Sequence, residues 1–147
     1  MDLRELYQQV IVDHNKNPRN FHKLDEPCQH AEGHNPLCGD KVNVYIRTED
    51  NIITNVSFEA LGCAISVASA SLMTEALKGK SIDDKDSLFA AVHTSLTERD
   101  SDIDLMDYGK LGVLANVKNF PMRVKCATLC WHTLEAALNQ ETSATTE

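Results

Sequence analysis

Two neighbouring stretches of alternating apolar and polar residues, 41–47 and 52–60, are separated only by a short polar turn. The apolar positions are Val42, Val44 and Ile46 in the first stretch, and Ile52, Val56, Phe58 and Ala60 in the second. Because successive side chains of a strand point to opposite faces, this pattern predicts two strands that each bury one face. A turn this short joins antiparallel neighbours, so the chain is predicted to contain a β-hairpin.

Helical periodicity flanks the hairpin on both sides, and Gln29 to His34 is a candidate third, edge strand. Helices are predicted at about 3–15, 63–78, 86–97 and 108–114, and from Pro121 onward. Gly79 and Pro121 suit a helix end and a helix start, respectively. Since the strands are grouped, we predict an α+β fold: a small antiparallel sheet of two to three strands packed against helices.

The chain has the length of one domain, 147 residues. We expect a single domain over 1–140 and a flexible polar tail over 141–147. No apolar run reaches the ~18 residues of a membrane span, so no membrane association is expected. The net charge of −8 argues against nucleic-acid binding. No basic segment followed by an apolar one is visible at the N-terminus, so we expect no signal peptide and a cytoplasmic location.

Three of the five cysteines fall at predicted junctions between elements. Cys38 lies in a turn before a strand, Cys63 at a strand-to-helix junction and Cys126 in the first turns of the last helix. Asp40 follows Cys38 by two residues, and Gly39 between them permits a backbone that turns both side chains toward one centre. Three thiolates and a carboxylate suit tetrahedral Zn²⁺. The spacing includes no short Cys–x–x–Cys pair, so three separate buried or loop cysteines remain the alternative.

Charge is unevenly distributed around the third of these cysteines. Residues 81–109 carry eight acidic and two basic side chains, whereas 110–126 carry four basic and no acidic ones. Arg123 and Lys125 of the basic segment could offset an anionic thiolate site. The alternative is a solvated acidic face beside a helix start, with Lys125 on the helix surface.

Four motifs in this order resemble the IscU/SufU family of iron–sulfur cluster assembly proteins. They are His14-Asn15-Lys16-Asn17-Pro18-Arg19-Asn20, Asn35-Pro36-Leu37-Cys38-Gly39-Asp40, Gly62-Cys63-Ala64-Ile65-Ser66 with Ala68-Ser69-Ala70-Ser71 behind it, and Arg123-Val124-Lys125-Cys126-Ala127-Thr128-Leu129. The resemblance covers nearly the whole chain from Leu3 to Leu138. It implies a SufE/NifU-like α+β fold and a role in handling sulfur received from a cysteine desulfurase.

Lys125 distinguishes two branches of that family. Scaffold-type members usually have a histidine directly before the third cysteine, whereas this chain resembles SufU-type members in having a basic residue there and an insertion that includes 81–109. That branch implies a zinc-dependent sulfurtransferase that activates a SufS-type desulfurase and serves downstream iron–sulfur assembly proteins. Cys38 is the implied sulfur acceptor, and Asp40, Cys63 and Cys126 complete the implied zinc site.

Two other functions stay open at this stage. The first is a scaffold on which a transient [2Fe–2S] cluster is assembled and passed on. The second is a zinc domain in which the metal only supports folding, although a chain of this length does not need a metal for its core.

The remaining thiols and imidazoles are expected to be bystanders. Cys130 continues an apolar stripe one turn after Cys126, which favours a core position. Cys28 matches no motif and is expected to be a loop thiol. We expect His34 on an edge strand, and no chemistry is assigned to His14. The other histidine of interest, His132, is expected at the surface or in packing.

Overall fold

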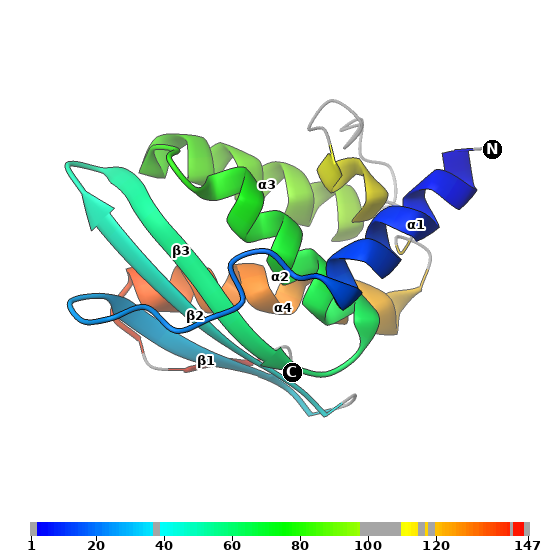
Figure 1. The fold of residues 1–147 in the computed structure, drawn as a ribbon, viewed down its shortest axis with the longest axis horizontal. Helices are drawn as coiled ribbons and strands as arrows, with labels where there is room; N and C mark the ends of the chain where they lie inside the picture. Colours follow the sequence, from blue (N-terminus) through cyan, green and yellow to red (C-terminus); the bar gives the residue numbers. More distant parts are fainter. Residues whose placement is uncertain are drawn as a thin grey trace.

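The computed structural model describes residues 3–36, 39–97, 110–114, 117, 120–141 and 143–145 (Figure 1). Its elements, in chain order, are α1 (Leu3–Lys16), β1 (Gln29–Asn35), β2 (Asp40–Glu49), β3 (Ile52–Leu61), α2 (Ala64–Leu77), α3 (Ile82–Thr97), α4 (Pro121–Leu138) and β4 (Ser143–Thr145). The strands form one sheet in the order β3-β2-β1-β4. The predicted α+β class and hairpin are confirmed, and β1 is the predicted third strand. It lies inside the sheet rather than at its edge, because β4 pairs with it in parallel, so the sheet has four strands and is mixed rather than antiparallel.

The hairpin turn explains how β2 and β3 pair in register. Asp50 and Asn51 both have positive φ, 52° and 65°. Two consecutive residues of this kind form the type I′ turn, whose twist matches that of the flanking strands. Glu49 therefore pairs with Ile52, and the ladder continues to the pair Lys41 and Leu61. This register places Leu61, and so the start of α2, beside the beginning of β2.

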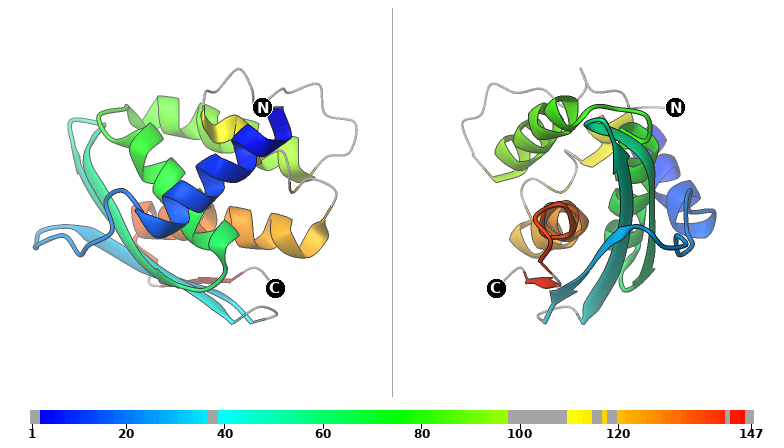
Figure 2. Two further views of the ribbon diagram at one scale, coloured as in Figure 1. Left: turned by 45° about the vertical axis from the view of Figure 1, so that its right-hand side comes forward. Right: turned by 90° about the vertical axis from the view of Figure 1, so that its left-hand side faces the viewer.

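Helices α2 and α4 pack against the sheet, and α1 packs against α2 (Figure 2). Strand β1 approaches α4 closely: a Cβ atom at Gly33 would lie 1.9 Å from Thr133 Oγ1. The core between sheet and helices includes Val44, Phe58 and Trp131, all essentially fully buried. Both α2 and α4 therefore have fixed positions relative to the strand ends.

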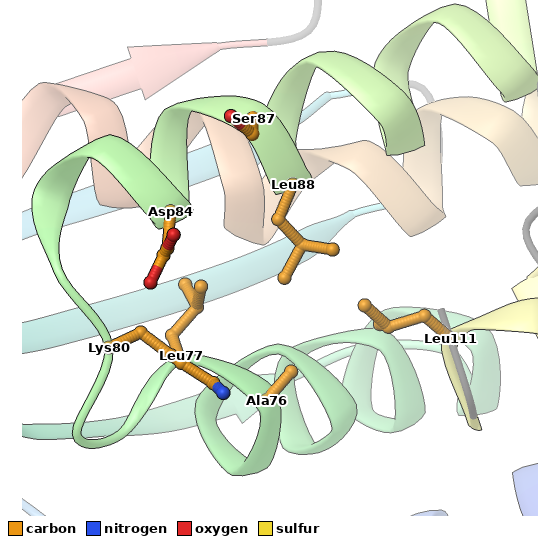
Figure 3. Close-up of a pocket in the computed structure, with 7 residues that line it drawn as sticks. All are labelled: Ala76, Leu77, Lys80, Asp84, Ser87, Leu88 and Leu111. Atoms are coloured by element: carbon orange, nitrogen blue, oxygen red, sulfur yellow. The ribbon is translucent and has the colours of Figure 1, made fainter. Parts of the chain in front are cut away.

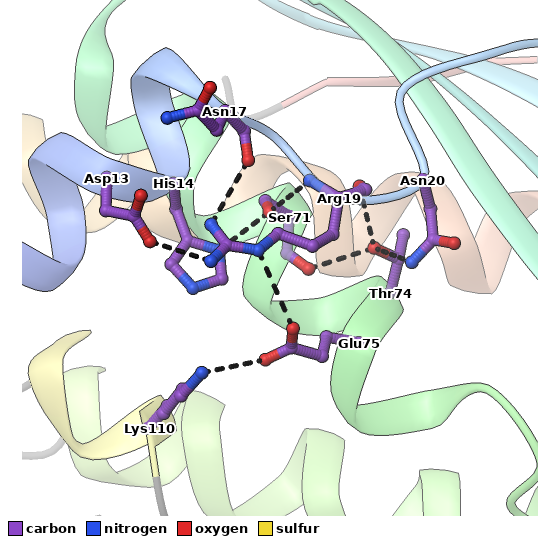
Figure 4. Close-up of polar contacts among 9 residues, drawn as sticks. All are labelled: Asp13, His14, Asn17, Arg19, Asn20, Ser71, Thr74, Glu75 and Lys110. Carbon is purple, nitrogen blue, oxygen red and sulfur yellow. Dashed lines mark hydrogen bonds and ion pairs between the residues drawn. The ribbon is translucent and has the colours of Figure 1, made fainter.

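The segment after α1 is attached to α2 and β3 by hydrogen bonds (Figure 4). The buried ring of His14 lies 2.7 Å from Ser71 Oγ, which also accepts a bond from the Arg19 backbone N–H. The side-chain amide of Asn20 donates to Thr74 Oγ1. The backbone carbonyl of Asn20 accepts a hydrogen bond from the backbone N–H of Phe58 in β3. Burial lowers the pKa of His14, with the neighbouring Arg19 adding to the effect. These hydrogen bonds hold the end of α1 and the residues after it against α2 and β3.

Three boundaries differ from the sequence-based expectation. Helix α3 begins at Ile82, a turn earlier than predicted, because Ser81 Oγ accepts the Asp84 backbone N–H and so caps the helix. The expected helix at 108–114 is a short 3₁₀ turn over 110–114, and 108–109 lie outside the described residues. Within the segment expected as a tail, Ser143–Thr145 pairs in parallel with β1; the domain limit at 140 and the tail's flexibility stay predictions.

Among the described residues, none forms a helix with the length and apolar character needed to cross a bilayer.

Candidate metal centre

Asp40 is the first residue of β2 and is completely buried. The preceding Gly39 has φ +71°, a conformation that glycine adopts without strain at the turn into the strand. The Asp40 carboxylate accepts the Cys63 backbone N–H at Oδ1, over 2.9 Å. The Cys63 thiol donates to its other oxygen, Oδ2, over 3.7 Å. A buried carboxylate is thus held at the start of α2 by the chain itself.

The contact between Asp40 and α2 requires a glycine at position 62. A Cβ atom there would lie 2.3 Å from Asp40 Oδ1 and 2.9 Å from its Cγ. Cys63 follows as the N-cap residue of α2, in extended conformation, and its side chain is exposed. Its thiol makes no capping bond, and Asp40 accepts the backbone N–H of Cys63 from outside the helix. The Cys63 sulfur therefore stays available at the helix N-terminus.

Cys126 reaches the same place from α4. Pro121 lies in the first turn of this helix, as predicted from its fixed φ and missing N–H. Cys126 follows in the second turn and is 3% exposed. The side-chain amide of Asn35, at the end of β1, donates toward Cys126 Sγ over 3.8 Å. Asp40, Cys63 and Cys126 therefore meet at the junction of one strand and two helices.

The ligand atoms of these three residues all lie within 4.8 Å of one another. Tetrahedral zinc with Zn–S distances of ~2.3 Å and Zn–O distances of ~2.0 Å places its ligand atoms roughly 3.3–3.8 Å apart. Small side-chain adjustments bring the three atoms to that separation. One carboxylate and two thiols are a donor set that suits zinc, and a cluster of thiolate-bound iron uses the same sulfur donors. The fourth predicted ligand, Cys38, lies outside the described residues.

The two predicted supporting cations occupy different environments on α4. Arg123 is exposed, and its guanidinium carbon lies 4.8 Å from the centre of the Phe120 ring. It borders an apolar groove together with α1 residues such as Ile11 and Val12. Lys125 is half-buried. Their influence on the charge of the site stays a proposal.

The two thiols that are expected to be bystanders, Cys130 and Cys28, do not belong to the group formed by Asp40, Cys63 and Cys126. Cys130 is completely buried, and burial raises its pKa to about 12. Its sulfur lies 3.5 Å from Ser69 Oγ of α2. Cys28 is half-buried and donates weakly to the Leu24 carbonyl, over 3.8 Å. Of the described residues, only Asp40, Cys63 and Cys126 form a group of three or more metal-capable side chains.

Two other histidines considered from the sequence, His34 and His132, lie elsewhere in the fold. His34 is exposed on β1. His132 on α4 contacts the rings of Phe89 and His93 on α3, with centroids 5.6 Å and 5.5 Å away. Burial, and then the nearby His93, lower the pKa of His132. It is a packing residue of the α3–α4 contact.

A separate cavity lies between α2, α3 and Leu111 (Figure 3). Its lining is mostly aliphatic, and its polar side chains are those of Lys80, Asp84 and Ser87. None of the lining residues is a cysteine or a histidine, so this cavity offers no soft metal ligand. The cluster at the start of α2 is the better candidate site.

Sequence reasoning missed Asn35 as a contact of the site. It is completely buried, although it is polar. Ala31, Gly33 and Asn35 alternate as the buried positions of β1. A polar residue that continues a buried alternation, inside one of the four motifs, was the signal that could have identified it.

Comparisons with known proteins agree on the family. The profile of the NifU-like N-terminal domain matches residues 6–140. The zinc-dependent sulfurtransferase SufU of Bacillus subtilis is 40% identical over 140 residues, which cover 95% of this chain and 94% of that protein. The iron–sulfur cluster assembly scaffold protein IscU of Thermotoga maritima is 35% identical and covers 95% and 97% of the two chains.

Solved structures agree with the fold as well. The crystal structure of a protein described as an iron–sulfur cluster assembly scaffold for the SUF system, from Fervidobacterium islandicum, superposes with a TM-score of 0.82. Its sequence is 34% identical, and the match covers 93% of this chain and 99% of that one. The N-terminal part of a NifU-like protein from Brucella abortus has a TM-score of 0.80 at 23% identity, which supports the fold alone.

Proposed function

The chain belongs to the NifU-like N-terminal domain family, and we propose that it is a zinc-dependent sulfur acceptor for iron–sulfur cluster assembly. In this proposal it takes persulfide sulfur from a SufS-type cysteine desulfurase, activates that enzyme and serves downstream assembly proteins. The observation that carries the proposal is the meeting of Asp40, Cys63 and Cys126 within 4.8 Å. The relative named a zinc-dependent sulfurtransferase supports it along nearly the full chain.

In the proposed site, zinc is held by Asp40, Cys63, Cys126 and Cys38. Cys38 precedes Asp40 by two residues, a span of at most about 7.6 Å between Cα atoms. Bound zinc favours the thiolate forms of its cysteine ligands at neutral pH. Three thiolates, one carboxylate and Zn²⁺ leave a net negative site, and we propose that Lys125 and Arg123 reduce the cost of that charge.

Cys38 is the proposed sulfur acceptor, and the step requires no oxidant or reductant. Its thiolate attacks the outer sulfur of the desulfurase persulfide. The S–S bond of that persulfide breaks, the desulfurase cysteine leaves as a thiolate, and a persulfide forms on Cys38. Gly39, with its positive φ, supplies backbone freedom next to the acceptor. The reactive thiols require a reducing compartment, which fits a proposed cytoplasmic location.

Metal content tests the first half of this proposal. Protein purified in air should contain one zinc per chain and be colourless. Cys63→Ala and Cys126→Ala should lose the metal, whereas Cys28→Ser, a matched loss of a thiol outside the cluster, should keep it. Full zinc content in both Cys63→Ala and Cys126→Ala would overturn the assignment of the site.

Mass spectrometry after incubation with desulfurase and cysteine tests the second half. We expect a sulfur adduct of one atom on Cys38 and none in Cys38→Ala. Cys28→Ser should retain the adduct and the stimulation of the desulfurase. Reproducible persulfide on Cys126 or Cys130 with unmodified Cys38 would refute the acceptor assignment.

The second candidate function is a scaffold that carries a transient [2Fe–2S] cluster. It is favoured by the Thermotoga maritima relative, which is named a scaffold protein. Cysteine sulfurs are the usual ligands of such clusters. Anaerobic purification with iron present, followed by a visible spectrum, separates the two: a brown protein with cluster absorption favours the scaffold, and a colourless zinc protein that activates the desulfurase favours sulfur transfer.

A further inference from the structure

Ser66, in the first turn of α2, has a buried hydroxyl without a hydrogen-bond partner. It is 1% exposed, and its Oγ has no hydrogen-bond partner among the described residues. Two other serines of the same helix are satisfied. Ser69 Oγ donates to the Ala127 carbonyl over 2.5 Å, and Ser71 Oγ bonds His14 and Arg19. Because buried polar groups are rarely left unpaired, the hydroxyl of Ser66 needs a functional explanation.

The contacts of Ser69 show where Ser66 points. Residues three apart lie on the same face of a helix, so Ser66 and Ser69 face the same neighbour. That neighbour is α4, since Ser69 Oγ lies 2.5 Å from the Ala127 carbonyl oxygen and 3.5 Å from Cys130 Sγ. Cys126 lies four residues before Cys130, on the same face of α4 and one turn nearer its N-terminus.

Both helices begin at the candidate metal centre. Cys63 is the N-cap residue of α2, Cys126 lies in the second turn of α4, and their sulfur atoms are within 4.8 Å of each other. One turn back along each helix from the Ser69–Cys130 contact therefore leads to Ser66 on α2 and Cys126 on α4. Helix geometry thus places Ser66 on the α4-facing side of α2, one turn closer to the centre than Ser69.

We propose that Ser66 is a positioning residue for the metal-binding thiolate of Cys126, to whose sulfur its hydroxyl donates a hydrogen bond. This inference rests on the proposed function. Ser66 Oγ makes no such bond in this structure. The bond requires the Cys126 side chain to turn toward the metal, and a thiolate then accepts it far more strongly than a neutral thiol does. Asn35 donates to the same sulfur from β1. The two donors orient Cys126 and reduce the charge that its sulfur gives to the metal.

Cobalt(II) binding to the full chain tests the role of Ser66, because sulfur-to-cobalt charge-transfer bands report directly on the thiolate ligands. Ser66→Ala should weaken the affinity for Co²⁺ about 10-fold or more, the usual effect of losing a partner of a ligand. It should also move the charge-transfer band to lower energy, because a thiolate without its hydrogen bond is a stronger electron donor.

Ser69→Ala is the matched control, since it removes a hydroxyl one turn away on the same face. It should leave the Co²⁺ affinity and band position as in the wild type, although it loses a bond to the Ala127 carbonyl. Thermal unfolding of the metal-free proteins provides a second readout. If Ser66 had only a structural role, Ser66→Ala would lower the stability of the metal-free protein. Ser66→Ala should be as stable as the wild type or more so, because it removes an unpaired buried polar group.

The role of Ser66 and the proposed metal function fail under different results. If Ser66→Ala binds Co²⁺ with wild-type affinity and an unshifted band, the role of Ser66 is refuted while the metal centre stands. If the wild-type protein itself shows no sulfur-to-cobalt band, the proposed metal function and the role of Ser66 both fail.

Discussion

Substitution of Gly62 by alanine should displace the Asp40 carboxylate without removing any ligand. The added Cβ would lie 2.3 Å from Asp40 Oδ1, more than 1 Å inside ordinary van der Waals contact. Asp40 is completely buried, so its side chain has little room to retreat except by giving up its bond to the Cys63 N–H. Gly62→Ala therefore perturbs the proposed metal centre through a single, identified contact.

The size of the effect follows from two contributions. A hydrogen bond to a charged group contributes about 1.5–3 kcal/mol to stability. Overpacking by one methyl group in a close-packed site adds roughly 1–3 kcal/mol. We expect Gly62→Ala to lose about 2.5–6 kcal/mol, which for a domain of this size lowers Tm by roughly 5–20 °C. Metal affinity should fall by at least about 10-fold, because a displaced Asp40 no longer presents its oxygen to the site.

Gly79→Ala is the control that distinguishes the effect of a glycine-to-alanine change on the backbone from its effect on the metal centre. Gly79 has φ +87°, and a Cβ atom there would meet no atom within 4 Å. The substitution should cost about 1–2 kcal/mol of left-handed strain and leave metal affinity unchanged. Calorimetric unfolding and Co²⁺ titration of both variants provide the measurement. If Gly62→Ala binds the metal as tightly as Gly79→Ala does, the Asp40 carboxylate is not a ligand held by this contact.

Three further predictions concern the helices around the site. Cys130 should resist alkylation by iodoacetamide in the native protein up to about pH 9, because burial raises its pKa to about 12; rapid labelling would contradict its core position. Lys85→Met should lose about 1–3 kcal/mol in denaturant unfolding, since the buried Lys85 joins α3 to Glu135 of α4, and unchanged stability would show that this ion pair is dispensable. The free energy of unfolding should decrease as the pH falls through about 6.5. Burial and the nearby His93 lower the pKa of His132 in the folded protein, so the unfolded chain binds the proton more readily. A pH profile that is equally steep in His132→Gln would assign the effect to other groups.

The sequence patterns that predicted the fold correctly were local ones. Alternation over 41–47 and 52–60 defined the hairpin, and Pro121 marked the start of α4. The pairing of Ser143–Thr145 with β1 had no such signal, since three small residues are too few to show a periodicity. Their strand forms because β1 has an open edge beside the end of α4, which is a property of the assembled sheet.

The candidate site was predictable in composition but not in arrangement. Junction positions predicted that Cys63, Cys126 and Asp40 converge, and the resemblance to the family named them together. The separation of 23 residues between Asp40 and Cys63 gave no indication that the carboxylate bonds the backbone of the cap residue. The need for glycine at position 62 was equally invisible, because it arises from contact with a residue of another strand.

The two oxygens of Asp40 connect the fold to the proposed chemistry. Oδ1 accepts the backbone N–H of Cys63 and thereby satisfies a group at the start of α2, while Oδ2 faces the Cys63 sulfur. Because separate atoms perform the two tasks, a metal bound through Oδ2 need not break the contact that holds the helix. The start of α2 is thus fixed by the protein itself, which also has an apolar core of its own between sheet and helices. A metal whose only task is to support folding would be redundant in such a structure, whereas a prearranged carboxylate and exposed thiol are what a site for sulfur chemistry requires.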